Sequence, residues 1–270
     1  MNLSELSPRK VYNMFRAGMK KELGQNFIFN EYICKNIVDA AGDLKNKIVV
    51  EIGPGAGGLT LEILRRNVKK LYIVEYDQHW VNVWTNLSQY SNGTLEVIHA
   101  DALRFDISSL KPQVVISNLP YNISTQLLYK WFNNFSSFER LVLMFQKEVA
   151  DRIIAQPKTK AYGQMSVLSQ WLSNIEKVCD LEPEDFSPPP KVKSSVLKFA
   201  PYKNIEHIEL YDDFMRFLTK AFSQRRKVIR KNIANDKTFN ELLQMGYLEN
   251  TRAEEISVSD YVKLITRIMD

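Results

Sequence analysis

The sequence predicts an α/β fold, in which a sheet carries helices on both faces and a small all-helical C-terminal domain follows. Three observations lead to this prediction. Short apolar runs alternate with segments of helical periodicity up to Lys203, as in a parallel sheet covered on both sides. A glycine-rich stretch follows the first apolar run, at a point where such sheets bind ligands. From Ile205 onward the periodicity is helical.

Each apolar run has the length of a strand and ends at turn-forming or charged residues. The expected strands are residues 47–52, 71–74, 95–98, 114–116, 141–145, 175–181 and 195–199. Helical spacing of apolar residues predicts helices at residues 59–64, 80–87 and 148–154, and around Leu127, Leu128 and Trp131. A proline-rich loop separates the last two strands.

The C-terminal segment has a different pattern. Its apolar side chains gather on one helix face, at Phe214, Phe217, Leu218, Ala221 and Phe222. We therefore place a domain boundary near Lys203. The expected domains are residues 1–203, with the sheet, and residues 204–270, which are helical.

The composition indicates a globular protein. Hydrophobic residues make up 45% of the 270 residues and charged residues 25%, which is ordinary for a folded domain. No apolar run is long enough to cross a bilayer. Two cysteines and three scattered histidines argue against a disulfide framework and against a metal site. Since no apolar export signal is evident, we expect a cytoplasmic protein. A net charge of +5 is compatible with a polyanionic partner.

The glycine-rich stretch indicates a nucleotide-type site. Gly53 and Gly55 stand where the backbone must turn tightly and approach a ligand. The spacing is G-x-G-x-G, whereas the dinucleotide fingerprint is G-x-G-x-x-G, so a bound pyrophosphate is not expected. Glu75 closes the next strand, where an acidic residue typically bonds ribose hydroxyls.

Two more polar residues close the following strands. Asp101 can accept a hydrogen bond from an adenine amino group, and Asn118 ends the strand after it. Taken singly, each strand-end residue is better explained as a helix cap or a turn residue. Their combined order points to one ligand at the carboxyl edge of the sheet. S-adenosylmethionine fits best, because its sulfonium is positive and it has no phosphates.

The stretch Asn118-Leu119-Pro120-Tyr121 predicts a site for an adenine amine. This amine is a poor nucleophile, since its lone pair is delocalised into the ring. The Asn118 oxygen and the carbonyl of Leu119 or Pro120 can accept its two N–H bonds. Tyr121 can stack on a base turned out of its helix. A plain turn after a strand would have the same composition. The adenine interpretation is favoured by the glycine-rich stretch and the acidic strand ends that precede it in the sequence.

The chain is similar, nearly end to end, to the KsgA/RsmA family of small-subunit ribosomal RNA adenine N6,N6-dimethyltransferases. The matching motifs are LGQNF (23–27), VEIGPG (50–55), VEYD (74–77), DA (101–102), NLPYNIS (118–124), QKEVA (146–150), YGQ (162–164) and FSPPPKV (186–192). The resemblance implies a Rossmann-like methyltransferase sheet whose cofactor pocket is lined by Asn26, Ile28, Gly53, Glu75, Asp101 and Asn118. Beside these positions, a contribution is expected from Gln25, Gly55, Tyr76 and Ala102. The family commonly has Leu where Ile28 stands.

The resemblance also implies the reaction. Two adjacent adenosines, in a hairpin loop near the 3′ end of small-subunit (16S) rRNA, would each receive two methyl groups on the exocyclic nitrogen from S-adenosylmethionine. The transfer would be an in-line displacement without a metal or a covalent enzyme intermediate. The expected partner is this rRNA within a pre-ribosomal particle, and the expected enzyme is a monomer that contacts no membrane and serves small-subunit biogenesis.

Phe186 has two interpretations. It lies in the proline-rich loop and resembles the family's second aromatic partner of the target base, which would stack opposite Tyr121. It can equally anchor the loop in the core, since aromatic residues are buried far more often than they bind ligands.

A basic run, residues 221–231, has five cations and no acid. On a helix it would present basic residues on one side and Val228, Ile229 and Ile233 to the core. A solvated basic face is the simpler interpretation, but a folded RNA substrate favours phosphate contacts. The expected RNA-binding residues are Lys147, Arg152, Arg225, Arg226, Lys227, Arg230 and Lys231.

Two alternatives share these motifs. An erythromycin-resistance-type enzyme would dimethylate one adenine of large-subunit rRNA, but the three prolines of residues 186–192 and the stretch 223–227 favour the small-subunit family. A ribosome-assembly factor with this fold would not need catalysis. The catalytic positions are intact, so any such role is expected to accompany enzyme activity.

Overall fold

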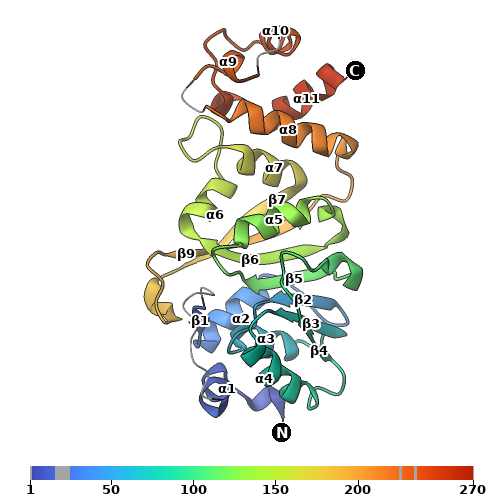
Figure 1. Ribbon diagram of the computed structural model, residues 1–270, viewed down its shortest axis with the longest axis vertical. Helices are drawn as coiled ribbons and strands as arrows, with labels where there is room; N and C mark the ends of the chain where they lie inside the picture. The colour runs from blue at the N-terminus through green and yellow to red at the C-terminus, as the bar shows by residue number, and fades with distance from the viewer. Residues whose placement is uncertain (1, 16–24, 225–226, 234–235, 270) are drawn as a thin grey trace. The chain divides into compact units, whose positions relative to one another are not determined.

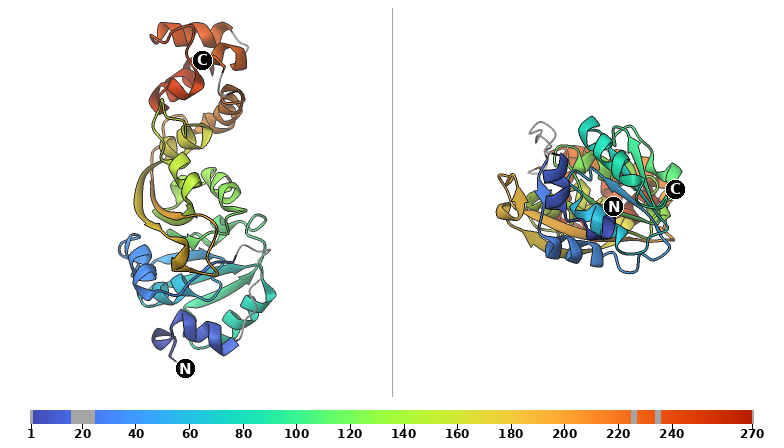
Figure 2. Two further views of the ribbon diagram at one scale, coloured as in Figure 1. Left: turned by 90° about the vertical axis from the view of Figure 1, so that its left-hand side faces the viewer. Right: turned by 90° about the horizontal axis from the view of Figure 1, so that it is seen from below.

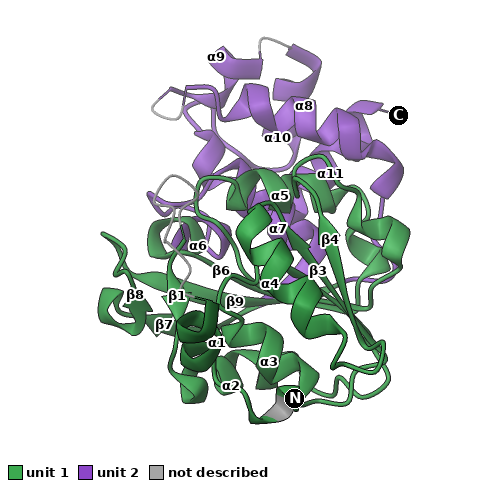
Figure 3. Cartoon of the chain, turned by 60° about the horizontal axis from the view of Figure 1, so that its bottom comes forward, with its two compact units in different colours: residues 1–150, 176–201 green, residues 151–175, 202–270 purple. Residues whose placement is uncertain are grey.

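The structure is a computed structural model that describes residues 2–15, 25–224, 227–233 and 236–269. The chain packs as two compact units, coloured separately in Figure 3. Unit 1 contains the described residues up to Ala150 together with Glu176–Pro201, and unit 2 contains Asp151–Ile175 and the described residues from Tyr202 onward. Residues 151–175 thus group with the C-terminal helices. That 1–203 and 204–270 are separate domains stays a prediction.

Unit 1 is built on a seven-stranded sheet of order β4-β3-β2-β5-β6-β9-β7. Its strands are β2 (Ile48–Ile52), β3 (Lys70–Glu75), β4 (Leu95–His99), β5 (Val114–Asn118), β6 (Arg140–Gln146), β7 (Ser173–Leu181) and β9 (Ser194–Pro201). The pairs from β4 to β6 are parallel, whereas β9 runs antiparallel to β6. The sheet is therefore mixed. A loop, and not a crossover helix, connects β7 to its neighbour β9, so β9 need not run parallel to the other strands.

Helices flank the strands of this unit (Figures 1 and 2). They are α1 (Pro8–Phe15), α2 (Glu31–Asp39), α3 (Gly58–Leu64), α4 (Gln78–Ser88), α5 (Ser124–Phe132) and α6 (Lys147–Ile153), which runs into unit 2. Along the chain, β3 and β4 are added on one side of the central strand β2, and β5 and β6 are added on its other side. Right-handed crossovers place α3 and α4 on one face and α5 on the other. The sheet order reverses between β2 and β5, which is where ligands bind in such sheets.

A second, two-stranded sheet joins distant parts of unit 1. It pairs β1 (Phe27–Ile28) with β8 (Phe186–Ser187) in antiparallel register, with Ile28 opposite Phe186. Both residues are buried and belong to the main hydrophobic core. The pairing therefore holds the segment just before α2 against the proline-rich loop.

The largest core side chains support the turns that follow the strands. Trp80 and Trp84 on α4 are fully buried. The indole N–H of Trp84 donates to the carbonyl of Gly55 at 2.8 Å. A helix on one face of the sheet thus holds the glycine-rich turn after β2.

Unit 2 is mainly helical. Its helices are α7 (Gln164–Leu172), α8 (Tyr211–Ala221), α9 (Ile229–Ile233), α10 (Asp236–Gln244) and α11 (Val258–Met269), and short 3-10 turns lie at Ile208–Leu210 and Ala253–Glu255. In unit 1 such turns are Leu3–Glu5, Ile107–Leu110, Phe135–Ser137 and Pro183–Asp185. The core of unit 2 includes the expected face of α8, with Phe214, Leu218 and Ala221 fully buried.

One expectation for unit 2 is wrong. The basic run does not form a continuous helix, because α8 ends at Ala221 and α9 begins only at Ile229. Residue 228 instead forms a β-bridge to Arg252. Ile229 and Ile233 are buried as expected. No helix among the described residues has both the length and the apolar content that a membrane crossing requires.

Candidate active site

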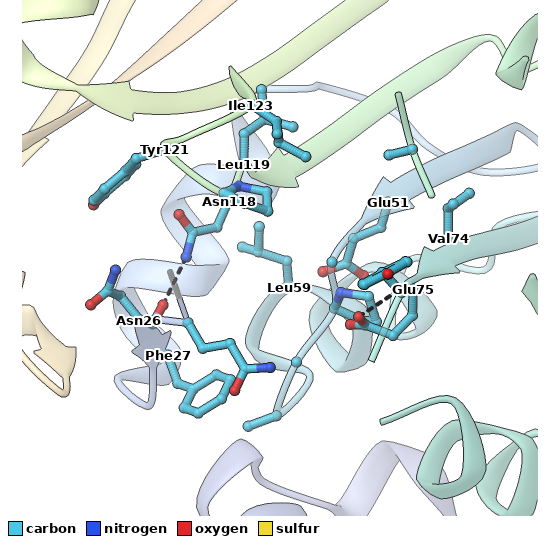
Figure 4. Close-up of a pocket in the computed structure, with 18 of the residues that line it drawn as sticks. Asn26, Phe27, Glu51, Leu59, Val74, Glu75, Asn118, Leu119, Tyr121 and Ile123 are labelled. Atoms are coloured by element: carbon cyan, nitrogen blue, oxygen red, sulfur yellow. Dashed lines mark hydrogen bonds between the residues drawn. The ribbon is translucent and has the colours of Figure 1, made fainter. Parts of the chain in front are cut away.

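A cavity of about 270 Å³ lies at the carboxyl ends of the central strands (Figure 4). It is lined by the turn after β2, by the ends of β3 and β5 and by the loop after β4. Gly53, Glu75, Asp101 and Asn118 all line it. The strand-end residues picked out in the sequence therefore meet in one cavity, at the point where the sheet order reverses.

The glycine-rich turn forms one wall of this cavity. Gly53, Gly55 and Gly57 all have positive φ, at 64°, 50° and 83°, which side chains rarely adopt. A Cβ at Gly55 would overlap the Phe27 ring, and one at Gly57 would overlap Trp84. Backbone conformation thus favours glycine at all three positions, and the packed rings of Phe27 and Trp84 favour it further at Gly55 and Gly57.

Two buried carboxylates face the cavity. Glu75 is 7% exposed, and its Oε1 accepts the backbone N–H groups of Tyr76 and Asp77 at 2.7 Å each. Burial raises the pKa of Glu75, and those backbone hydrogen bonds oppose the shift. A backbone hydrogen bond from Gly55 also lowers the pKa of Glu75. A carboxylate has about four acceptor sites, so Glu75 can still accept from a ligand hydroxyl.

Glu51 was not predicted as a site residue. It is 2% exposed and lines the cavity, and its Oε2 accepts the Thr60 hydroxyl at 2.6 Å. Burial raises its pKa to about 8, the Thr60 hydrogen bond lowers it, and Glu75 adds to the increase. An acidic residue inside the otherwise apolar strand of residues 48–52 is a signal that could have identified it.

The loop after β4 forms the opposite wall, with Asp101, Ala102 and Leu103 in the lining. The Asp101 Oδ1 accepts the N–H of Leu103 at 2.9 Å, so the carboxylate shapes its own turn. Lys130 on α5 was also missed by the sequence interpretation. Its ammonium donates to three carbonyls of this loop.

The amide of Asn118 has a defined orientation. Its Nδ2 donates to the carbonyl of Asn26 at 3.0 Å. A carbonyl can only accept, so the amide nitrogen must face Asn26. The Asn118 oxygen consequently points away, toward the side on which Tyr121 lies (Figure 4). The side chain is thus arranged as a hydrogen-bond acceptor.

Tyr121 lines the cavity and is half-buried. Its hydroxyl lies 2.5 Å from the hydroxyl of Ser194 on β9. Burial raises the pKa of Tyr121, against the effect of the Ser194 hydrogen bond. The ring is therefore tethered at its far end.

Phe186 lies in the core. It is 4% exposed and is not among the residues that line the cavity. In this conformation its ring cannot stack on a base, and its position agrees with the interpretation as a core anchor. A stacking role would require the proline-rich loop to move, and it stays a prediction.

The remaining predicted lining residues come from two further segments. Gln25, Asn26 and Ile28 precede α2, and Tyr76 follows β3; all line the cavity. The Gln25 amide donates to Asp77 Oδ2 at 2.9 Å. Ile28 is buried, and its carbonyl would meet any Cβ added at Gly58. Tyr76 is 62% exposed, at the rim.

The cavity has an acidic lining, in which Glu51 holds its proton more strongly than an ordinary carboxyl because burial raises its pKa to about 8. Glu51, Glu75 and Asp101 line it, and none of the described lining residues is a lysine, an arginine or a histidine. Carboxylates without cations repel phosphates and stabilise positive charge. The residues therefore fit a cationic, hydroxyl-bearing nucleoside. No group of three or more His, Cys, Asp or Glu residues that could hold a metal occurs in the described part of the chain.

The predicted RNA-binding residues differ in how far other side chains of the protein already engage their charges. Lys147 lies 3.5 Å from Asp180 in an ion pair. Arg230 stacks on Phe239 and pairs with Asp236. Arg152, Lys227 and Lys231 are exposed, and the two lysines line a second cavity in unit 2, with Arg252. Arg225 and Arg226 lie outside the described residues.

A sheet of this order, with an acidic cavity at its carboxyl edge, defines a Rossmann-like methyltransferase. The solved structures agree. A dimethyladenosine transferase from Plasmodium falciparum has a TM-score of 0.80 at 27% identity, covering 90% of this chain and 97% of that one. The 23S rRNA methyltransferase ErmE has a TM-score of 0.68 at 20% identity, covering 91% and 100%; at that identity it shows the fold alone.

The sequence comparisons are more specific. The family model described as ribosomal RNA adenine dimethylase matches residues 16–270. The "Ribosomal RNA small subunit methyltransferase A" of Wolbachia sp. subsp. Drosophila simulans (strain wRi) is 44% identical over 253 residues, which cover 92% of this chain and 93% of the relative. The chain belongs to the ribosomal RNA adenine dimethylase family.

Proposed function

We propose that this chain uses S-adenosylmethionine to dimethylate the exocyclic N6 of two adjacent adenosines, in a hairpin loop near the 3′ end of small-subunit rRNA. The observation that carries the proposal is the orientation of Asn118. Its amide is held by the Asn26 carbonyl, and its oxygen faces the side of Tyr121 beside an acidic cavity. This is an acceptor placed for an amine, next to a site suited to a cation.

The cofactor is assigned to the cavity from its charge. Glu75 would accept the ribose hydroxyls, because a carboxylate has acceptor sites beyond those used by the backbone N–H groups of Tyr76, Asp77 and Gly55. Asp101 and the Ala102 segment would bind the adenine edge. The glycine turn at Gly53 and Gly55 lets the backbone approach the rest of the molecule. The bound molecule would supply an electrophilic methyl group on a positive sulfur.

The target adenine is assigned to the rim beside β5. Asn118 Oδ1 and a backbone carbonyl would accept the two N–H bonds of the amine. The Pro120 carbonyl already accepts the N–H of Ile123 at 3.1 Å, so the Leu119 carbonyl is the better candidate for the second acceptor. Tyr121 would stack on the base once it has been turned out of the RNA.

These residues would act by positioning. Two acceptors in the plane of the amino group turn its lone pair toward the methyl group, which converts a rare encounter into a fixed geometry. The proton can leave after the methyl group has been transferred, so no residue is assigned as a general base. After one methylation the N6 amine has a single N–H. The monomethylated adenine would bind again for the second transfer with this N–H toward either Asn118 or the backbone carbonyl.

The small-subunit sequence match supports rRNA as substrate, and the exposed cations of unit 2 support phosphate contacts. We further propose that the natural substrate is a pre-ribosomal particle, and that the enzyme works as a cytoplasmic monomer, since maturing rRNA is found there. Light scattering of the purified protein after size-exclusion chromatography tests the oligomeric state, co-sedimentation with small-subunit particles tests the particle as substrate, and cell fractionation tests the location.

The test of the function uses rRNA from a strain that lacks the gene. Mass spectrometry of that rRNA should show unmodified adenosines at the two sites. Restoring the wild-type gene should return N6,N6-dimethyladenosine to both, whereas Asn118→Ala should not. Methylation of large-subunit rRNA in its place would identify an erythromycin-resistance-type enzyme. Unchanged modification in the deletion strain would refute the proposal.

A further inference from the structure

The loop that forms the adenine side of the cavity is attached to α5 by one side chain. Lys130 donates to the carbonyls of Ala102 at 3.2 Å, Leu103 at 2.9 Å and Phe105 at 2.6 Å. A lysine ammonium has three N–H donors, and here each has a carbonyl within reach. Ala102 and Leu103 both line the cavity, so this contact lies directly behind the ligand wall.

Burial of Ala102 and hydrogen bonds within the loop also help to keep this shape. Asp101 closes its first turn by accepting the N–H groups of Leu103, Arg104 and Phe105 through its side chain and carbonyl. Those bonds are all local. Lys130 provides a connection to a different element, the helix that follows the Asn118–Ile123 segment. Burial lowers the pKa of Lys130, and the nearby carboxylates of Asp106 and Asp101 oppose this shift only in part.

We propose that Lys130 is a positioning residue for S-adenosylmethionine: it holds the residue 101–105 loop in its ligand-binding shape without itself lining the cavity. The inference rests on the proposed assignment of the adenine to this loop. A loop that is already ordered costs less free energy to bind to than one that the ligand must order. Lys130 would therefore act on cofactor affinity and not on methyl transfer.

Lys130→Met tests this by removing the ammonium while keeping most of the stem. In the full-length protein, the dissociation constant for S-adenosylhomocysteine should rise by about tenfold, as expected if the loop is competent only a tenth of the time. The KM for S-adenosylmethionine should rise in parallel, with kcat at saturation unchanged. Amides of residues 102–105 should exchange faster in the ligand-free variant and return to wild-type rates with ligand.

Lys70→Met is a matched control. Lys70 also ties a loop to the sheet, with its ammonium 3.0 Å from the Gly93 carbonyl and 2.8 Å from Glu96. It begins β3, whereas the cavity is at the other end of that strand. Removing it should cost stability without changing ligand affinity.

Three results would overturn the inference: an unchanged dissociation constant in Lys130→Met, a fall in kcat with KM unchanged, or an equal loss of affinity in Lys70→Met. If Lys130→Met does not fold, Lys130→Arg carries the same test, because a planar guanidinium keeps the charge but cannot meet three carbonyls in this way. Failure of the wild-type protein to bind S-adenosylhomocysteine would instead refute the proposed function.

Discussion

The side-chain amide of Asn118 is held by the backbone carbonyl of Asn26, 92 residues away in sequence, at 3.0 Å. The bond decides which end of the Asn118 amide is left for other partners in the cavity. Because the nitrogen is used by Asn26, the oxygen remains as the acceptor. The segment around Asn26 therefore sets the orientation of the Asn118 acceptor.

Asn118→Ala should bind S-adenosylhomocysteine with wild-type affinity by calorimetry and lose methyl transfer by about a hundredfold or more, the typical effect of removing one preorganised polar group. Asn118→Asp should also fail, because a carboxylate cannot donate to Asn26. Asn133→Ala, an exposed amide just after α5, is the control. Undiminished transfer in Asn118→Ala would remove this residue from the mechanism.

Glu75→Gln should weaken the binding of S-adenosylhomocysteine by about 1.5 to 3 kcal/mol, the cost of losing a hydrogen bond to a charged acceptor. The Gln oxygen can still accept from Tyr76 and Asp77, so the loop should keep its shape. Glu96→Gln, on the exposed side of β4, should have no effect in the same titration. Equal affinities for Glu75→Gln and wild type would refute the ribose assignment.

Glu51 should make the ligand-free protein less stable at alkaline pH. Its pKa rises on folding from 4.5 to about 8, so the folded state holds a proton that the unfolded chain has lost. The stability from this group is complete below pH 4.5 and is lost as the pH rises toward 8 and beyond. Between roughly pH 5.5 and 8.5, the free energy of unfolding of Glu51→Gln should fall less with rising pH than that of the wild type, as measured by chemical unfolding. Identical pH slopes would mean that Glu51 does not retain its proton in the folded state.

Tyr121 and Ser194 should behave as one unit. Tyr121→Phe keeps the ring and loses the hydroxyl, and Ser194→Ala removes its partner; each should lower kcat about threefold to tenfold, the value of one hydrogen bond. The double variant should be no worse than either single variant. Ser195→Ala is the matched control, since Ser195 is equally buried and bonds Asp180 instead. If the losses of kcat in the two single variants multiplied in the double variant, the two hydroxyls would act independently.

The exposed lysines of unit 2 should contribute to RNA affinity through phosphate contacts. Lys227→Ala with Lys231→Ala should reduce the slope of log affinity against log salt by roughly 1.4 to 1.8. Arg230→Ala should reduce it less, because Arg230 is engaged with Phe239 and Asp236. Lys45→Ala with Lys69→Ala, two exposed cations of unit 1, should leave the slope unchanged. An unchanged salt slope in the Lys227→Ala, Lys231→Ala variant would show that these two lysines do not contact RNA phosphates.

The sequence predicted the residues that terminate strands and missed those that act across the fold. Glu75, Asp101 and Asn118 could be found because parallel strands end at one edge, so sequence order is enough to bring them together. Lys130 and Ser194 could not, since their contacts depend on how α5 and β9 lie against loops that are distant in the chain. The antiparallel direction of β9 was missed for the same reason.

Periodicity also misled at the basic run. Cations and apolar residues recur at helical spacing through residues 221–231, but the pattern does not report where a helix ends. The structure ends α8 at Ala221 and pairs Val228 with Arg252. Tertiary pairing of this kind overrides local preference, and it changes which cations share a surface.

The most direct measurement is a crystal structure of the enzyme with S-adenosylhomocysteine and an RNA hairpin that contains the target adenosines. We expect the nucleoside of the cofactor between Glu75 and Asp101, and the N6 of the target adenine within about 3 Å of Asn118 Oδ1, beside the Tyr121 ring. A cofactor bound outside this cavity, or a base whose amino group is turned away from Asn118, would contradict this expectation.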